Sequence, residues 1–317
     1  MNIIWKKVAL FVATALVLPM FAASASADDG KAALKFVPKD TMMVISIDVN
    51  SLKKTSIFKE MMTAIMQDAD AKKNLKMFKE ATGFDPEKDL ESIVIALPPD
   101  VEKTENFLFI AKGKVDEKKF ISFAKDQGGK IAEGKAAGQA YYEIDSEAAV
   151  AFVGDHIVMG PKVALEASLN TKKGNDKAVT DNSDMSGLIG AVDTKANIWM
   201  AVILPDDIRK ELAKQDPNAG DITDAHASVD LGSGLKLRLT LGTGASGTAD
   251  SIVKLAQEGL KSVKSDPNIG AMGLDPVFTG LSVAAAGKKV NVSLDLSQAD
   301  FDRIVEMVKA MAMGGMR

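Results

Sequence analysis

The sequence predicts an α+β protein built as two similar modules, each a strand and a helix followed by two hairpin-helix units. Apolar and polar residues alternate over short stretches, which is typical of half-buried strands. These stretches occur in pairs joined by turn residues, and each pair is followed by apolar residues at helical spacing. Because hairpins pair antiparallel strands with one apolar face, we expect antiparallel sheets covered by helices.

The clearest hairpin-helix stretch is Gly234–Gly259. Its leucines alternate with polar residues, so they share one face of a strand: Leu235, Leu237, Leu239 and Leu241. Apolar residues then recur at helical spacing: Ile252, Val253, Leu255, Ala256, Leu260 and Val263. The pattern predicts that this helix lies on the leucine face of the strand.

Residues 1–27 have the pattern of a secretory signal peptide. Lys6 and Lys7 precede an apolar run from Val8 to Ala22, and Ala25-Ser26-Ala27 fits a cleavage site. The apolar run is shorter than the roughly 20 residues that span a bilayer, so we expect no transmembrane span after cleavage. The sequence therefore predicts an exported, soluble protein, either periplasmic or extracellular.

The first module is predicted to cover residues 38–170, after a disordered lead at 28–37. Gly83 and Asp85-Pro86 mark the end of a helix and a turn before the first hairpin. The expected elements are a strand at 43–49, a helix capped by Asn50 or Ser51 that contains residues 57–66, a helix at about 70–82, strands at 91–97 and 106–113, a helix from 116, a hairpin turning at Gly154-Asp155, and a helix at 162–170. The pattern also indicates a short strand, Tyr141–Ile144, without predicting its partner.

Residues 171–184 are polar and are predicted to be a linker, followed by a second module at 185–313. Its expected elements are a strand at 198–204, a helix at 206–215, a hairpin-helix unit at 222–264 and another from Gly273 onward. Ser297 is suited to cap the last helix. The matching order of the two halves predicts an internal duplication.

The segment Gly83-Phe84-Asp85-Pro86, with Asp89 and Leu90 after it, lies between an amphipathic helix and a strand. In this respect the chain resembles uncharacterised secreted bacterial envelope proteins of the domain-of-unknown-function type, over residues 38–113. The resemblance implies location and shape, because such families bring no established activity. The motif itself is a cap and a turn.

The amino-acid composition excludes several classes of function. The formal net charge is −4 and no basic run is present, so nucleic acid is not an expected partner. The chain has no cysteine, which excludes disulfides, thiolate chemistry and a cysteine-linked lipid anchor. We expect no cofactor.

Gly242–Gly247 matches G-x-G-x-x-G between a strand and a helix, with Asp266 downstream. A dinucleotide site needs a parallel βαβ unit, whereas this strand is predicted in a hairpin, so we interpret the glycines as a flexible joint. His156 and His226 are the chain's two histidines. We expect His156 to flank a turn and His226 to lie on the solvated side of a strand.

Methionine is frequent, with 16 residues, and two groups are candidate sites. Met61, Met62 and Met66 share one side of a predicted helix and are candidate contacts for a ligand or partner if they are exposed, or core residues if they are buried. The C-terminal group is Met307, Met311, Met313 and Met316. Thioethers suit Cu(I), so this tail is a candidate metal site, although a fraying helix end explains it equally well.

The leading functional hypothesis is an exported, non-enzymatic protein that binds a protein partner or an apolar ligand. One alternative is a hydrolase with a site assembled between the two modules. The other is Cu(I) handling through the methionine-rich tail. No residue in the sequence is assigned as catalytic.

Overall fold

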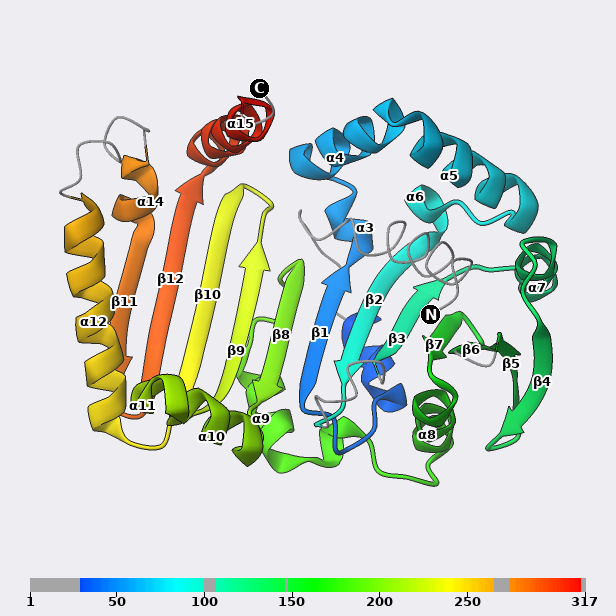
Figure 1. Cartoon of the computed structure of the whole chain (residues 1–317), viewed down its shortest axis with the longest axis horizontal. Coiled ribbons are helices and arrows are strands. Elements are labelled where there is room, and N and C mark those ends of the chain that lie inside the picture. The colour runs from blue at the N-terminus through cyan, green and yellow to red at the C-terminus, as the bar shows by residue number, and fades with distance from the viewer. Residues whose placement is uncertain (1–28, 100–106, 146–147, 265–273, 315–317) are drawn as a thin grey trace. The chain divides into compact units, whose positions relative to one another are not determined.

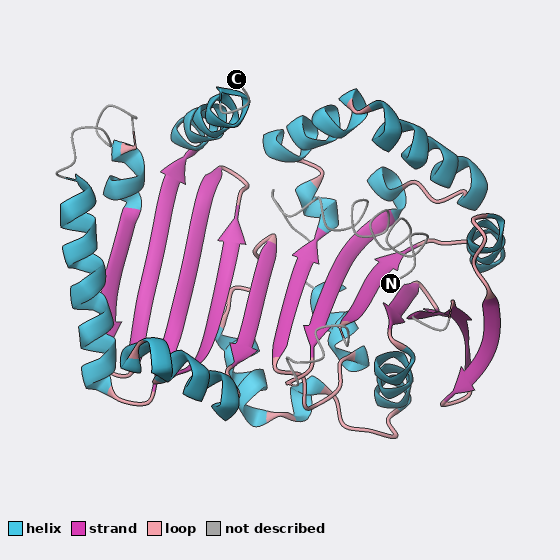
Figure 2. Cartoon of the chain, in the orientation of Figure 1, coloured by secondary structure: helices cyan, strands magenta, loops and turns pink. Residues whose placement is uncertain are grey.

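The computed structural model describes residues 29–99, 107–145, 148–264 and 274–314, with side chains described up to residue 307. It has the predicted α+β fold, in which helices accompany antiparallel strands (Figure 2). The chain forms two compact units, Met1–Gly187 with Thr194–Ile198, and Leu188–Asp193 with Trp199–Arg317. The predicted signal peptide, residues 1–27, lies outside the described residues.

The first unit contains the predicted strand, helices and two hairpins, with further elements (Figure 1). Its helical elements are α2 (Asp29–Ala33), η1 (Leu34–Phe36), α3 (Val49–Leu52), α4 (Ser56–Gln67), α5 (Ala69–Thr82), α6 (Pro86–Asp89), α7 (Glu117–Asp126), α8 (Lys162–Lys173) and η3 (Val179–Asp181). Its strands are β1 (Met43–Asp48), β2 (Leu90–Leu97), β3 (Leu108–Gly113), β4 (Ile131–Ala136), β5 (Gln139–Ile144), β6 (Ala148–Val153) and β7 (His156–Gly160).

The strands of the first unit are ordered β1-β2-β3-β7-β6-β5-β4, and the pairs are antiparallel. The central strands are buried along most of their length, because β2 reads LESIVIAL and β3 reads LFIAKG with few polar positions. Helices contribute Leu75, Phe78, Ile121 and Leu165 to the same core. Burial on this scale supplies most of the stability of a cysteine-free unit.

One expectation for the first unit is wrong, and the structure supplies one strand partner that the sequence left open. The lead at 28–37 is ordered from Asp29, and both Phe36 and Val37 have no exposed surface. Tyr141–Ile144 does have a partner: β5 pairs with β4, a strand that the sequence analysis did not predict.

The segment predicted to be a linker, 171–184, contains the end of α8, η3 and the start of α9 (Ser183–Ala191). Val179 within it is fully buried, and its backbone N–H donates to the Val37 carbonyl over 2.8 Å. This part of the chain therefore packs on the first unit.

The second unit contains β8 (Ile198–Ile203), α10 (Asp206–Gln215), α11 (Pro217–Gly220), β9 (Ile222–Asp230), β10 (Gly234–Thr243), α12 (Ser246–Lys264), α14 (Asp275–Gly280), β11 (Leu281–Ala286), β12 (Lys289–Ser297) and α15 (Gln298–Gly314). Its strands are ordered β8-β9-β10-β12-β11. Five adjacent strands of the first unit, β1-β2-β3-β7-β6, have the same order. In both units the first strand is followed by a hairpin, and the second strand of a later hairpin pairs with that first hairpin. The internal duplication remains a prediction.

Candidate functional site

The second unit has an apolar sheet face whose middle is only half-buried. Leu237 of β10 pairs with Val229 of β9 and with Leu294 of β12. Leu239 pairs in the same way with Ala227 and Val292. Paired residues point to the same side of a sheet, so these side chains form two adjacent apolar rows. We call Ala227, Val229, Leu237, Leu239, Val292 and Leu294 the open apolar face, and each of them is half-buried.

Helices cover the two ends of these rows. Ala249 and Val253 of α12 form a buried cluster with Val290 of β12. Partly buried residues that pack against this cluster include Leu241, Val283 and Val292, so α12 also contacts one edge of the open apolar face. At the other end α15 packs on β10 and β12, where Leu296 is buried. In the view of Figure 2 the helices of this unit lie along β11 and at the strand ends, and the middle of β9, β10 and β12 is not crossed by a helix. α12 therefore packs on the apolar face of the sheet, as predicted, but only toward one end of the rows.

The opposite face of the same sheet is polar. The Arg238 guanidinium donates to both carboxylate oxygens of Asp295 over 2.8 and 3.0 Å, and Thr240 donates to Asn291 over 3.0 Å. His226 lies on this face but is half-buried, and its Nδ1 is buried without a hydrogen-bond partner among the described residues, so it is less solvated than the sequence predicts. The sheet therefore has one polar side and one apolar side, and other apolar groups can be buried on the apolar side.

Met61, Met62 and Met66 all lie on α4 and are all half-buried. Phe58 is the buried residue of this helix, and Ile57 and Ile65 are half-buried like the methionines. The methionines are thus neither all buried nor fully exposed. Their role as ligand or partner contacts remains a prediction.

The C-terminal methionines are only partly described. Met307 is half-buried on α15, Met311 and Met313 continue that helix with side chains outside the described part, and Met316 lies outside it. Among the described residues no group of three or more His, Asp or Glu side chains is placed to hold a metal ion. Cu(I) binding by the tail remains a prediction.

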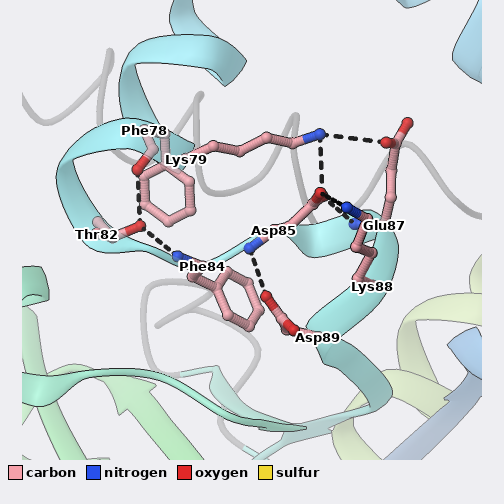
Figure 3. A network of polar contacts seen from close by, with 8 residues as sticks. All are labelled: Phe78, Lys79, Thr82, Phe84, Asp85, Glu87, Lys88 and Asp89. Carbon is pink, nitrogen blue, oxygen red and sulfur yellow. Dashed lines mark hydrogen bonds and ion pairs between the residues drawn. The ribbon is translucent and has the colours of Figure 1, made fainter.

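The Gly83-Phe84-Asp85-Pro86 segment forms a closed polar network at the end of α5 (Figure 3). Gly83 ends α5 in the left-handed conformation with φ 71°, and Asp85 caps α6 by accepting from the Glu87 N–H. Lys79 Nζ lies 2.9 Å from Asp85 and 3.1 Å from Glu87, and Asp89 accepts from the Asp85 N–H over 2.7 Å. Although partial burial opposes ionisation, bonds from Lys79 and the Glu87 N–H lower the pKa of Asp85. These carboxylates serve a cap and a turn, as predicted, and Phe84 beneath them is buried.

The glycine-rich segment Gly242–Gly247 holds a carboxylate of the chain itself. The Gly244 N–H donates to the Asp221 carbonyl over 2.9 Å, and the Ala245 N–H donates to the Asp221 carboxylate over 3.0 Å. A Cβ on Gly244 would lie 2.3 Å from Asp221 Oδ1, which explains the glycine. Bonds from Thr248 and these N–H groups lower the pKa of Asp221. The preceding strand is antiparallel to both neighbours, so the segment is the predicted joint and does not have the parallel geometry of a dinucleotide site.

His156 flanks the turn at Gly154-Asp155, as expected, but its side chain is only 5% exposed. It lies at the start of β7, with Nδ1 2.6 Å from the Asp155 carboxylate. Its Nε2 has no hydrogen-bond partner among the described residues. Buried polar atoms without partners are rare, and the sequence offered no signal for this one.

No protein-family model and no curated protein matches this sequence. Among solved structures, crystal form I of TP0453 is similar at a TM-score of 0.45 and 10% identity, covering 87% of this chain and 96% of that chain. Crystal form IV of TP0453 gives a TM-score of 0.47 and 9% identity, covering 88% of this chain and 99% of that one. Within the described residues, no helix has both the length and the apolarity needed to cross a membrane.

Proposed function

We propose that this protein is exported and acts without catalysis, binding an apolar ligand, or an apolar segment of a protein partner, on the open apolar face. One observation carries the proposal: Leu237, Leu239 and their strand partners form registered apolar rows that are only half-buried. Contiguous exposed apolar surface generally marks a place where another molecule binds.

The sparse burial of the second unit supports this function. Its strands β10, β11 and β12 are rich in leucine, valine and alanine, yet the fully buried side chains of β11 and β12 are limited to Val290 and Leu296. Covering the middle of the face with an apolar molecule removes this area from water at about 25 cal/mol per Å². Such a ligand completes the core of the unit.

The polar groups support a binding role over a catalytic one. Asp85 and Asp221 accept backbone N–H groups, and Glu91 pairs with Lys112 over 2.9 Å. The bonds that lower the pKa values of Asp85 and Asp221 keep these two carboxylates charged near neutral pH. Export is supported by the leader sequence with its Ala25-Ser26-Ala27 cleavage pattern.

The test is binding of the apolar dye 1-anilinonaphthalene-8-sulfonate to the mature protein, followed by fluorescence. We expect saturable binding that Leu239→Gln weakens about fivefold, because losing roughly 1 kcal/mol of apolar contact corresponds to that factor. Thr240→Gln is the matched control, since it adds the same side chain one residue along on the opposite face. Dye displacement by an organic extract of the protein's own envelope fraction would then show a natural apolar ligand.

Equal dye affinity for the wild-type protein and Leu239→Gln would contradict the proposal. Circular dichroism of both variants distinguishes a lost contact from a lost fold.

A further inference from the structure

His156 and Phe36 form a buried contact between β7 and the N-terminal segment α2–η1. The two rings lie with centroids 5.0 Å apart at 36°, and Phe36 has no exposed surface. The same segment is held by the Val179–Val37 hydrogen bond and by packing of α8 on η1. His156 is therefore part of the buried surface against which residues 29–37 pack.

The hydrogen bonding of His156 fixes where a proton would be added. Nδ1 lies 2.6 Å from Asp155 and donates its hydrogen to that carboxylate, so the neutral ring carries its lone pair on Nε2. Nε2 is buried and has no partner among the described residues. Protonation would thus create a buried N–H without an acceptor as well as a buried charge.

The charged groups around this contact are mostly cations. Lys35 of η1 and Lys172 of α8 place their amino groups 5.7 and 5.6 Å from the centre of the Phe36 ring, and Lys112 of β3 is paired in register with His156. β6 brings Val153 opposite His156, which carries no charge. Asp155 is the acid that favours the protonated ring, and Glu91 pairs with Lys112 over 2.9 Å.

Burial lowers the pKa of His156 from its ordinary value of 6.5, and Lys35 and Lys112 lower it further, while Asp155 opposes them. Release of residues 29–37 would remove part of the burial and the Lys35 charge that lower this pKa, so the neutral ring stabilises the closed state at neutral pH. This stabilisation is lost as the pH falls toward the pKa of His156 in the closed state.

From this geometry we propose that His156 is an acid-sensitive latch for the N-terminal segment, residues 29–37. At neutral pH the uncharged imidazole packs on Phe36 and keeps the segment closed. At mildly acidic pH the ring takes a proton at Nε2, repels Lys35 and Lys112, and the segment opens from the first unit.

The test is amide hydrogen exchange of the mature protein at pH 7.5 and 5.5, expressed as protection factors so that the intrinsic pH dependence of exchange is removed. We expect protection of residues 29–37 to fall by up to about tenfold per pH unit below 6.5, the limit for release of one proton-linked group. His156→Gln should remove this pH dependence, because glutamine does not titrate.

His226→Gln is the matched control and should keep the wild-type pH dependence, since His226 is the other of the chain's two histidines. Unchanged pH dependence in His156→Gln would overturn the proposal, as would equal protection of the wild-type segment at both pH values. If His156→Gln does not fold, nitrogen-15 NMR of the wild-type imidazoles decides. A neutral ring protonated at Nδ1 and titrating below pH 6.5 together with the segment's signals supports the latch, and a ring titrating independently of them overturns it.

Discussion

At the scale of single residues, glycines in this chain mark places where a carboxylate approaches the backbone. A Cβ on Gly244 would lie 2.3 Å from Asp221 Oδ1, whereas one on Gly247 would meet no atom within 4 Å. We expect Gly244→Ala to lower the free energy of unfolding by about 1–3 kcal/mol through this clash. Gly247→Ala should be neutral or slightly stabilising, because alanine favours a helix start over glycine. Urea denaturation of both variants measures the difference.

If Gly244→Ala and Gly247→Ala were equally stable, Asp221 would not occupy the position that the structure gives it. Gly247 lies in the first turn of α12, three residues after Gly244, so both substitutions are made at the same strand-to-helix junction.

Lys79 and Lys76 provide a second comparison, one turn apart on α5. Lys79 is 24% exposed and bridges Asp85 and Glu87, while Lys76 is 74% exposed with Glu80 3.7 Å away. At pH 7 we expect Lys79→Ala to cost about 1 kcal/mol and Lys76→Ala less than about 0.5 kcal/mol, because exposed ion pairs contribute little.

The loss of unfolding free energy caused by Lys79→Ala should depend on pH. The pKa of Asp85 is lowered in the folded protein, so its contribution is present above its ordinary value of 3.8 and is lost as the pH falls through the folded pKa. Denaturation curves at pH 7 and in strong acid should therefore differ between wild type and Lys79→Ala only at the higher pH. A difference that persists in acid would show that Lys79 acts mainly by packing.

At the scale of elements, α12 contributes few buried contacts for its length. Val253 is 9% exposed and packs against Val290, while Leu255 is 55% exposed. We expect Val253→Ala to cost about 1–2 kcal/mol and Leu255→Ala to have almost no effect on the free energy of unfolding. If Val253→Ala and Leu255→Ala lowered the free energy of unfolding equally, α12 would have to be rotated about its axis relative to the structure.

Period-two and helical spacing predicted the strands and helices of all four hairpin-helix units, but not β4 or α9. β4 reads IAEGKA, and its Gly134 makes room for the Tyr141 ring, which would lie 2.3 Å from a Cβ there. α9 contains two glycines, and its burial of Met185 and Ile189 depends on tertiary packing. Both elements are stabilised by residues distant in sequence, which local patterns do not report.

The candidate site was predictable only in part, for a similar reason. Alternating leucines on β10 identify an apolar face, and the apolar stripe from Ile252 to Val263 identifies a helix able to cover it. Where the helix lies on the sheet is decided by Ala249 and Val253 meeting Val290, which leaves Leu237 and Leu239 half-exposed. The spacing of apolar residues in the sequence does not specify where the helix lies on the sheet.

At the scale of the whole molecule, the two units share a strand order but differ in how completely they bury it. In the first unit β3 is buried at nearly every position, whereas in the second β10 is half-buried or exposed at most positions. Since burial is the main source of stability, we expect the second unit to unfold at a lower denaturant concentration than the first.

Trp199 makes this difference measurable. The chain has two tryptophans, of which Trp5 lies in the predicted signal peptide, and Trp199 is 2% exposed in the second unit. In mature protein the fluorescence transition in urea should therefore precede the bulk of the far-ultraviolet circular dichroism transition. Coincident transitions would show that both units unfold as one cooperative body. A saturating apolar ligand should move the fluorescence midpoint upward.

The bonds from Gly244 and Ala245 to Asp221 have a consequence for protein engineering. Backbone amides at a helix start attract oxyanions, and here the attraction is satisfied internally by a side chain that a single codon change can shorten. Replacing Asp221 with glycine would remove the carboxylate that accepts from the Ala245 N–H and free this amide for inorganic phosphate, while the Gly244 N–H would keep its bond to the backbone carbonyl of residue 221.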